Sequence, residues 1–178
     1  DAIAANGSCT NIVREGLKQL IALTLDIEIA GEATNGSEVL QQVQGGIFDL
    51  LLLDMNMPGV NGSELIGLVK ACRPALPILV YSMHNEAHVA SSTFKAGASG
   101  YFTKNSDPKM LMEAIRKVSG GGQYIDPAIA EQMAFDSAFP QLKLPHTLLS
   151  DREFEIFRLL VAGKSVNEIA EQLFISNK

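Results

Sequence analysis

One run of residues constrains the fold of this 178-residue chain more than any other: Ile47–Leu53 is apolar at every position except Asp49. A strand with one face in water alternates apolar and polar residues, whereas a strand buried on both faces is apolar nearly throughout. We therefore expect this run to be a central strand of a parallel sheet that helices cover on both sides.

Strand-like and helix-like patterns alternate over about the first 120 residues. Three further apolar segments predict strands at Ile27–Ala30, Pro77–Ser82 and Gly100–Thr103. The clearest helix is Asp107–Val118, where an acidic cap and Pro108 precede an apolar stripe at helical spacing. Other helical patterns cover residues 12–23, 37–45, 63–72 and 87–96. Such alternation with short connections predicts a doubly wound α/β domain.

The pattern changes after residue 120. Tyr124–Ala134 predicts one more short helix, begun by Asp126 and Pro127, and Phe135–Thr147 has no helical period and reads as a linker. Two short helices follow, because 150–153 and 165–168 both have the Ser-x-x-Glu pattern of a capping box. Such a pair is typical of a helix-turn-helix, and a plain helical hairpin is the alternative.

Composition excludes several classes of protein. The net charge of −6 and the pI of about 5.0 argue against a protein that coats nucleic acid, but not against a small DNA-reading module. No apolar run approaches the roughly 18–20 residues of a membrane span. We therefore expect no membrane partner. Cys9 and Cys72 form neither a metal motif nor a disulfide framework, so we expect a reducing, cytoplasmic location. The chain lacks an initiator Met and stops at Lys178, so we expect a piece of a longer protein.

Three polar side chains stand at the ends of three predicted strands: Asp54, Ser82 and Lys104. The carboxyl ends of parallel strands meet at one edge of a sheet, where open α/β folds bind ligands. Each residue alone has an ordinary structural reading, as a strand end, a turn hydroxyl or a surface lysine. Together they suit an aspartate that accepts a phosphoryl group, with an ammonium and a hydroxyl to bind the phosphoryl oxygens.

These landmarks resemble a two-component receiver domain. The run Leu-Leu-Asp54-Met-Asn-Met-Pro-Gly-Val-Asn-Gly62 is similar to the receiver phosphoacceptor loop, and Ser82–Glu86 and Ala96–Lys104 are similar to its next two motifs. The segment Ser150–Lys178 resembles the start of a LuxR-type helix-turn-helix. From Ile12 to its end, the chain is therefore similar to a response regulator of the NarL/FixJ family.

The resemblance implies a role for each site residue. Asp54 would be phosphorylated by a sensor histidine kinase, Ser82 and Lys104 would bind the phosphoryl group, and Tyr101 would be the aromatic switch. Asp54 and the backbone carbonyl of Asn56 would bind Mg²⁺. The fold would be the five-stranded, flavodoxin-like receiver with strand order 2-1-3-4-5 and a small all-α module after it. The intact protein would dimerise on activation and bind promoter DNA.

The beginning of the chain departs from this family. Receivers begin with an apolar strand that ends in two adjacent acidic residues, and Ser8 and Cys9 stand in their place here. Residues 1–10 are small and polar and predict a poor central strand. Because Mg²⁺ prefers several oxygen ligands, often carboxylates, we expect this chain to bind Mg²⁺ weakly or not at all and to be phosphorylated poorly.

These expectations divide the chain into a receiver domain at 1–120, a linker helix and linker at 121–147, and the start of a LuxR-type domain at 148–178. Its recognition helix would begin near Ser176, so we expect most of it to be missing and this chain itself not to bind DNA. We expect no enzyme, because aspartyl-phosphate phosphatases carry a second acid where this chain has Asn56. The alternative function is a phosphorylation-independent pseudo-receiver, which the missing acidic pair favours.

Overall fold

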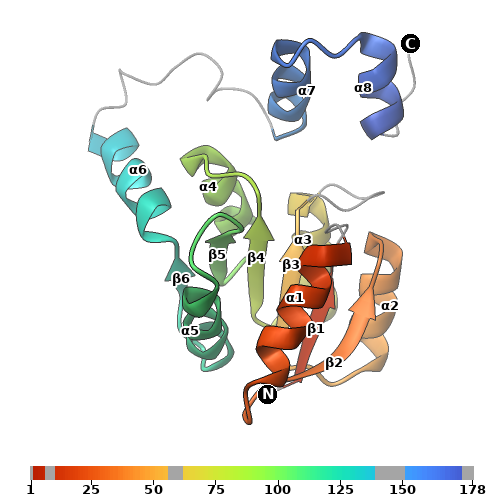
Figure 1. Ribbon diagram of the computed structural model, residues 1–178, viewed down its shortest axis with the longest axis vertical. Coiled ribbons are helices and arrows are strands. Elements are labelled where there is room, and N and C mark those ends of the chain that lie inside the picture. Colours follow the sequence, from red (N-terminus) through yellow and green to blue (C-terminus); the bar gives the residue numbers. More distant parts are fainter. Residues whose placement is uncertain (1, 7–10, 56–61, 139–150, 174–178) are drawn as a thin grey trace.

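The computed structural model describes residues 2–6, 11–55, 62–138 and 151–173. Its centre is a six-stranded, wholly parallel sheet with the order β2-β1-β3-β4-β5-β6 (Figure 1). The strands are β1 (Ala2–Asn6), β2 (Glu28–Ala33), β3 (Leu50–Asp54), β4 (Ile78–Ser82), β5 (Gly100–Thr103) and β6 (Tyr124–Ile125). The doubly wound α/β class and the order of the first five strands are confirmed. The sheet has one strand more than the five expected.

Helices cover both faces of this sheet. They are α1 (Asn11–Ala22), α2 (Gly36–Gly45), α3 (Gly62–Cys72), α4 (Ala87–Ala96), α5 (Pro108–Ser119) and α6 (Pro127–Ala138). The Gly97 backbone has φ = +111°, which suits glycine and ends α4 at the predicted position. No described helix is both long enough and apolar enough to cross a membrane.

The central strand β3 explains why two separate cores form. Leu50 and Leu52 face α1 and α5, whereas Leu51 and Leu53 face the core formed with α2, α3, α4 and α6. Adjacent side chains of a strand point to opposite faces, so a strand between two layers of helices must be apolar at every position. The strand is shorter than the sequence predicted, because Ile47 lies before it and is 85% exposed.

The first strand corrects one expectation. Residues 1–10 predict a poor central strand, yet Ala2–Asn6 pairs in parallel with both β2 and β3. Its partner strands would each leave a row of backbone groups unpaired without it, and this cost outweighs a weak strand propensity. Asn6 pairs with Leu53, so the described part of β1 ends beside the residue before Asp54.

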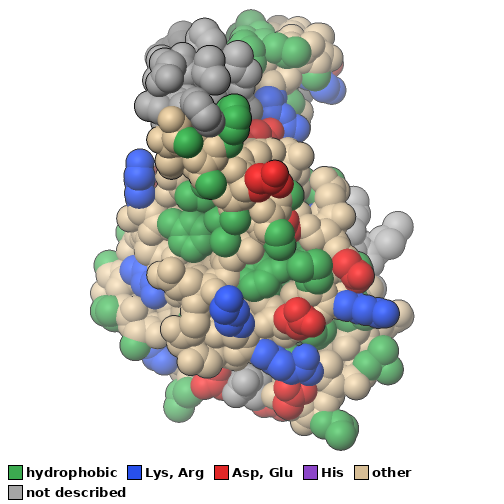
Figure 2. Space-filling model, turned by 90° about the vertical axis from the view of Figure 1, so that its left-hand side faces the viewer, with side chains coloured by type: hydrophobic (Ala, Val, Ile, Leu, Met, Phe, Trp, Pro, Cys, Tyr) green, Lys and Arg blue, Asp and Glu red, His purple; other side chains and the backbone are tan. Residues whose placement is uncertain are grey.

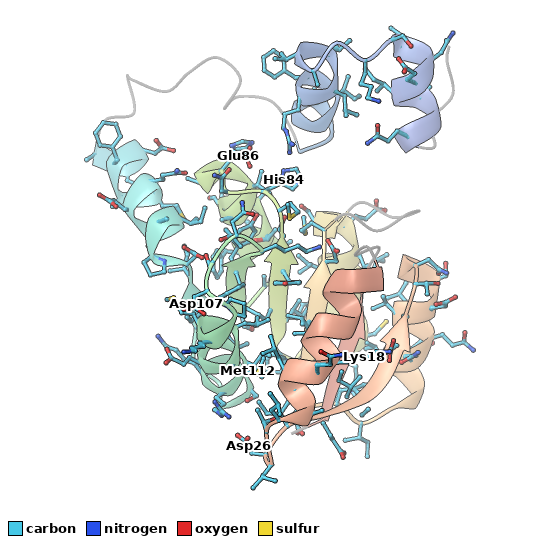
Figure 3. All side chains as sticks on the ribbon, in the orientation of Figure 1. Lys18, Asp26, His84, Glu86, Asp107 and Met112 are labelled. Carbon is cyan, nitrogen blue, oxygen red and sulfur yellow. The ribbon has the colours of Figure 1, made fainter. Side chains whose placement is uncertain are left out.

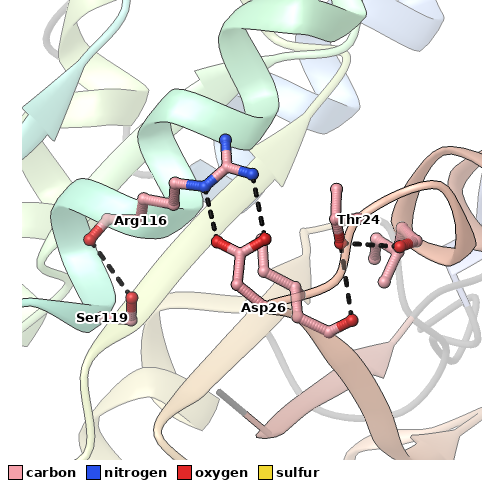
Figure 4. A network of polar contacts seen from close by, with 6 residues as sticks. Thr24, Asp26, Arg116 and Ser119 are labelled. Atoms are coloured by element: carbon pink, nitrogen blue, oxygen red, sulfur yellow. Dashed lines mark hydrogen bonds and ion pairs between the residues drawn. The ribbon is translucent and has the colours of Figure 1, made fainter.

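An ion pair on the surface joins helix α5 to the loop between α1 and β2. Arg116 of α5 donates through Nε and Nη2 to both carboxylate oxygens of Asp26, which lies in the loop between α1 and β2, at 2.8 and 3.1 Å (Figure 4). This hydrogen bonding holds the pKa of Asp26 below its ordinary value and raises that of Arg116. Both side chains are about half exposed, so the pair contributes little to stability.

The segment after residue 120 differs from the predicted linker helix. Tyr124 and Ile125 form β6 alongside β5, and only then does α6 begin. Ile129 of α6 is fully buried in the same core as Tyr101 and Ala90. The segment 124–138 is thus a sixth strand–helix unit of the receiver fold, because it completes the sheet edge and one of the two cores. Residues 139–147 of the predicted linker lie outside the described residues.

Two more helices, α7 (Asp151–Val161) and α8 (Val166–Leu173), form the C-terminal module. The second predicted capping box is confirmed: Glu168 accepts from the Ser165 amide at 2.8 Å, and the Glu168 amide donates to the Ser165 hydroxyl at 3.3 Å. This bonding lowers the pKa of Glu168. Ser150, of the first predicted box, and Ser176 lie outside the described residues.

The packing of α6 yields a test. Replacing the buried Ile129 with Ala should lower the free energy of unfolding of the receiver by about 2–4 kcal/mol, because it removes core volume. Replacing Phe135 of the same helix, which is 55% exposed, should cost about 1 kcal/mol or less. Urea denaturation followed by circular dichroism measures both. Equal, small effects would mean that α6 is a linker outside the folded unit.

Candidate functional site

The predicted site residues meet at the carboxyl edge of the sheet. Asp54 is the last residue of β3, Ser82 is the last residue of β4, and Lys104 directly follows β5. These three strands are neighbours in the sheet, so the residues stand side by side. Asp54 is 1% exposed and Ser82 is fully buried. Asn56, Ser8 and Cys9 lie outside the described residues.

The central contact is an ion pair between Lys104 and Asp54. The Lys104 ammonium donates to Oδ2 of Asp54, and the Lys104 side chain is only 7% exposed. Its Nζ also lies 5.1 Å from the centre of the Tyr81 ring, within range of a cation–π interaction. A buried carboxylate is costly unless a cation and hydrogen bonds compensate it. Lys104 supplies this compensation.

The backbone places Lys104 beside β4. Its amide donates to the Ser82 carbonyl at 2.8 Å, which extends the pairing of β4 and β5 one residue beyond Thr103. The loop therefore leaves the sheet only after Lys104, and the ammonium reaches across β4 to Asp54. A lysine at this position has its charge directed along the edge of the sheet, where an anion held at Asp54 would lie.

Ser82 is connected to the loop that follows it. Its hydroxyl oxygen accepts from the His84 amide at 3.1 Å, and its own hydrogen can donate to an anion. The His84 carbonyl in turn accepts from the Tyr101 hydroxyl at 2.9 Å. Tyr101 is fully buried in the core that contains α4 and α6. One backbone segment thus joins the hydroxyl at the site to the predicted switch residue.

The same loop contacts the C-terminal module. Figure 3 shows His84 and Glu86 at the top of the receiver, below α7. Nη1 of Arg158, in α7, lies 2.7 Å from Nδ1 of His84, and the Glu86 carboxylate lies 3.6 Å from the same nitrogen. Burial acts to raise the pKa of Glu86. The neighbouring His84 ring and the Arg158 guanidinium lower it by more, so the pKa of Glu86 lies below its ordinary value. Sequence reasoning missed this contact, because no local pattern pairs residues 74 positions apart.

A second polar network, also missed, lies next to the site on β5. Asp126 is 4% exposed, and its carboxylate accepts from the hydroxyls of Thr103 and Ser106. The sequence signal for Asp126 was only that of a helix cap before Pro127. The two hydroxyls, at the end of β5 and in the turn after it, lie 23 and 20 residues away in the sequence, so they could not be paired with Asp126 from sequence alone.

The metal ligands that a receiver needs are not found among the described side chains. No three His, Cys, Asp or Glu side chains in the described ranges come together in a metal-binding group. Asp54 provides one carboxylate, and Lys104 already binds one of its oxygens. The chain between Ala2 and Thr10 has no acidic residue to add. Among the described residues, Asp54 alone does not provide the several hard oxygen ligands through which Mg²⁺ binds.

The surface over α5 and α6 shows no strong charge of one sign. In Figure 2, hydrophobic side chains gather in the middle of this face, and side chains of both charges are scattered over its lower part. A groove or patch that binds nucleic acid through its phosphates is strongly basic. This visible face therefore does not have the charge of a nucleic-acid interface.

Comparison with known proteins gives two family matches. Residues 10–116 match the response regulator receiver domain, and residues 147–178 match the bacterial regulatory proteins of the luxR family. The chain is 33% identical over 168 residues to the response regulator UvrY of Escherichia coli strain K12, which covers 94% of this chain and 77% of UvrY.

Solved structures agree with these matches. A two-component response regulator of the LuxR family from Aurantimonas sp. SI85-9A1 superposes with a TM-score of 0.73 at 31% identity, covering 77% of this chain and 97% of that chain. A structure of two RcsB dimers bound to two parallel DNAs shares the fold over 98% of this chain and 83% of that chain, with a TM-score of 0.71 at 24% identity.

The ion pair at the site can be tested by a double-mutant cycle. Lys104→Met should destabilise the protein by about 3 kcal/mol, because it leaves the Asp54 carboxylate buried without a cation. Adding Asp54→Asn should restore most of this loss, since both charges are then removed. Urea unfolding of the four proteins measures the coupling. The exposed Asp26–Arg116 pair is the control and should show a much smaller coupling, and additive effects at Asp54 and Lys104 would contradict a buried pair.

Proposed function

Because the chain belongs to the NarL/FixJ-type response regulators, which join a receiver domain to a LuxR-type DNA-binding domain, we propose that Asp54 is its phosphoacceptor. The observation that carries this proposal is the convergence of Asp54, Ser82 and Lys104 on one edge of the sheet, with the Lys104 ammonium on the Asp54 carboxylate. The receiver spans residues 1–120 with the additional unit to 138, and the LuxR-type module begins near residue 148.

Phosphoryl transfer at this edge needs a nucleophile and compensation for charge. One carboxylate oxygen of Asp54 attacks the phosphorus of a phosphohistidine on a sensor kinase. The phosphorus–nitrogen bond breaks, its electron pair stays on the leaving imidazole, and that nitrogen takes a proton from solvent. Lys104 transfers its contact from the carboxylate to a phosphoryl oxygen, and the Ser82 hydroxyl donates to another.

The new charge would be sensed through the loop after β4. Ser82 and Tyr101 both bond to the backbone of His84, so a movement of Ser82 toward the phosphoryl group changes the contact that holds Tyr101. Arg158 of α7 bonds to the ring of the same residue. Phosphorylation would therefore shift the balance between a packing that holds the output module and one that frees it.

Partners and location follow from this role. Response regulators act with sensor histidine kinases and bind promoter DNA, and we assign both partners to the intact protein, with dimerisation on activation. A sensor kinase presents its phosphohistidine in the cytoplasm, which is where we place this protein. The described helices α7 and α8 correspond to the first part of the DNA-binding domain.

The role of Mg²⁺ is weaker here than in other receivers. Receivers generally bind Mg²⁺, which supplies charge neutralisation during phosphorylation. In this chain Asp54 and the backbone carbonyl of Asn56 would be its ligands, without an acidic pair. We therefore assign charge neutralisation to Lys104 and expect slow phosphorylation. We assign the protein the role of a switch and not of an enzyme, because the sequence has Asn56 where a phosphatase of this fold carries its second acid.

The proposal is tested by intact-mass measurement after incubation with phosphoramidate and Mg²⁺. The wild-type chain should gain the mass of one phosphoryl group in a minor fraction of molecules, and Asp54→Asn should gain none. Asp49→Asn, an exposed aspartate before the same strand, is the matched control and should behave as wild type. Raising the Mg²⁺ concentration should change the yield little, because Lys104 rather than a metal ion neutralises the charge in this proposal.

Three other outcomes would each be decisive. Mass gain in Asp54→Asn would place the phosphoacceptor elsewhere. Complete phosphorylation that depends on Mg²⁺ would refute the weak metal site. Absence of any mass gain in the wild-type chain, with signalling intact after Asp54→Asn, would favour the pseudo-receiver.

A further inference from the structure

We propose that Asp126 is a positioning residue that ties helix α6 to the loop carrying Lys104, so that the phosphoryl site and α6 are coupled in both directions. The proposal rests on the proposed function, since it concerns the same lysine. It adds a residue outside the receiver motifs and a route from the site to the segment that leads to the output module. This route leaves the site through other residues than the route through His84, and both routes reach Tyr101.

The carboxylate of Asp126 makes contacts in two directions. Oδ2 accepts from the Thr103 hydroxyl at 3.0 Å and from the Ser106 hydroxyl, and these two hydroxyls lie 2.7 Å apart. Oδ1 accepts from the Ala128 amide at 3.1 Å, which caps the first turn of α6. One oxygen thus binds the loop after β5, and the other binds the beginning of α6.

The loop side of this network encloses Lys104. Thr103 precedes the lysine and Ser106 follows it by two residues, so both of the residues that Asp126 holds flank Lys104. The Ser106 amide also donates to the Thr103 carbonyl at 3.1 Å, which closes the turn. A displacement of this turn moves the backbone that directs the ammonium toward Asp54.

The helix side of the network leads into the core around the switch residue. The Asp126 amide donates to the Tyr101 carbonyl at 3.1 Å. Ile129, one turn into α6, is fully buried in the same core as Tyr101, and α6 packs against α4. A shift of α6 would therefore displace Tyr101 and α4, and a repacking of Tyr101 would displace α6.

Capping alone does not require this arrangement. Asp107 begins α5 in the same way: it is also an aspartate before a proline, it accepts from the Lys109 amide at 2.9 Å, and it lies at the surface (Figure 3). Burying a carboxylate costs free energy that an exposed cap avoids. Asp126 is buried because it binds two hydroxyls as well as its own helix. The comparison also provides a matched control, since the two caps differ mainly in this link.

The first test needs no phosphodonor. Ser106→Ala removes one hydroxyl of the loop and leaves the cap of α6 intact, so amide hydrogen exchange at residues 128–138 should become about three- to tenfold faster. Ser106→Thr keeps a hydroxyl and should restore the wild-type rates. Asp107→Ala and Ser137→Ala, which disturb the cap of α5 and an exposed hydroxyl of α6, should leave the early turns of α6 unchanged. Unchanged exchange in Ser106→Ala would overturn the proposal.

The second test reads the coupling from the other side. The initial rate of mass gain with phosphoramidate should fall about three- to tenfold in Ser106→Ala and Asp126→Ala, and stay at the wild-type value in Ser106→Thr and Asp107→Ala. By linkage, phosphorylation of the wild-type chain should slow exchange in α6, and Ser106→Ala should abolish this effect. If the wild-type chain gains no mass, the proposed function fails, and the first test still decides the link. If it gains mass and Ser106→Ala matches it in both measurements, only the proposal about Asp126 fails.

Discussion

The buried contact between Lys104 and Asp54 is the interaction on which the rest of this structure depends. A parallel sheet brings the ends of β3, β4 and β5 to one edge, and the apolar layers on both sides withdraw that edge from water. A carboxylate held there needs a cation, and the backbone bond from Lys104 to Ser82 places one within reach. The same contact makes the site responsive, because a phosphoryl group on Asp54 competes for the lysine.

Two sets of contacts lead away from this pair, and they reach different parts of the chain. Ser82, His84 and Tyr101 form one, which meets Arg158 of the C-terminal module. Asp126 forms the other, from the loop around Lys104 to α6. Both meet in the core between β5, α4 and α6, where Tyr101 is buried. Tight packing there means that one part of this core cannot move alone.

Much of the fold was predictable, since apolar periodicity is a local property. The apolar strand before Asp54, the stripe of α5 and the helix over residues 87–96 were all correctly interpreted from a few adjacent residues. Two strands could not be predicted in this way. Ala2–Asn6 is a strand because its neighbours require a partner, and Tyr124–Ile125 is one because β5 has an open edge. The residue pattern of each segment does not show that its neighbouring strand needs a partner.

The sequence by itself determined which chemical groups stand at the strand ends, because residue type and strand position are local. It placed Asp54, Ser82 and Lys104 on one edge through the rule that parallel strands share a direction. Only the tertiary structure decided which groups touch: Lys104 with Asp54, Asp126 with two hydroxyls of another loop, and Arg158 with His84. Contacts between residues 20 to 74 positions apart depend on how the layers pack, and packing is a property of the whole fold.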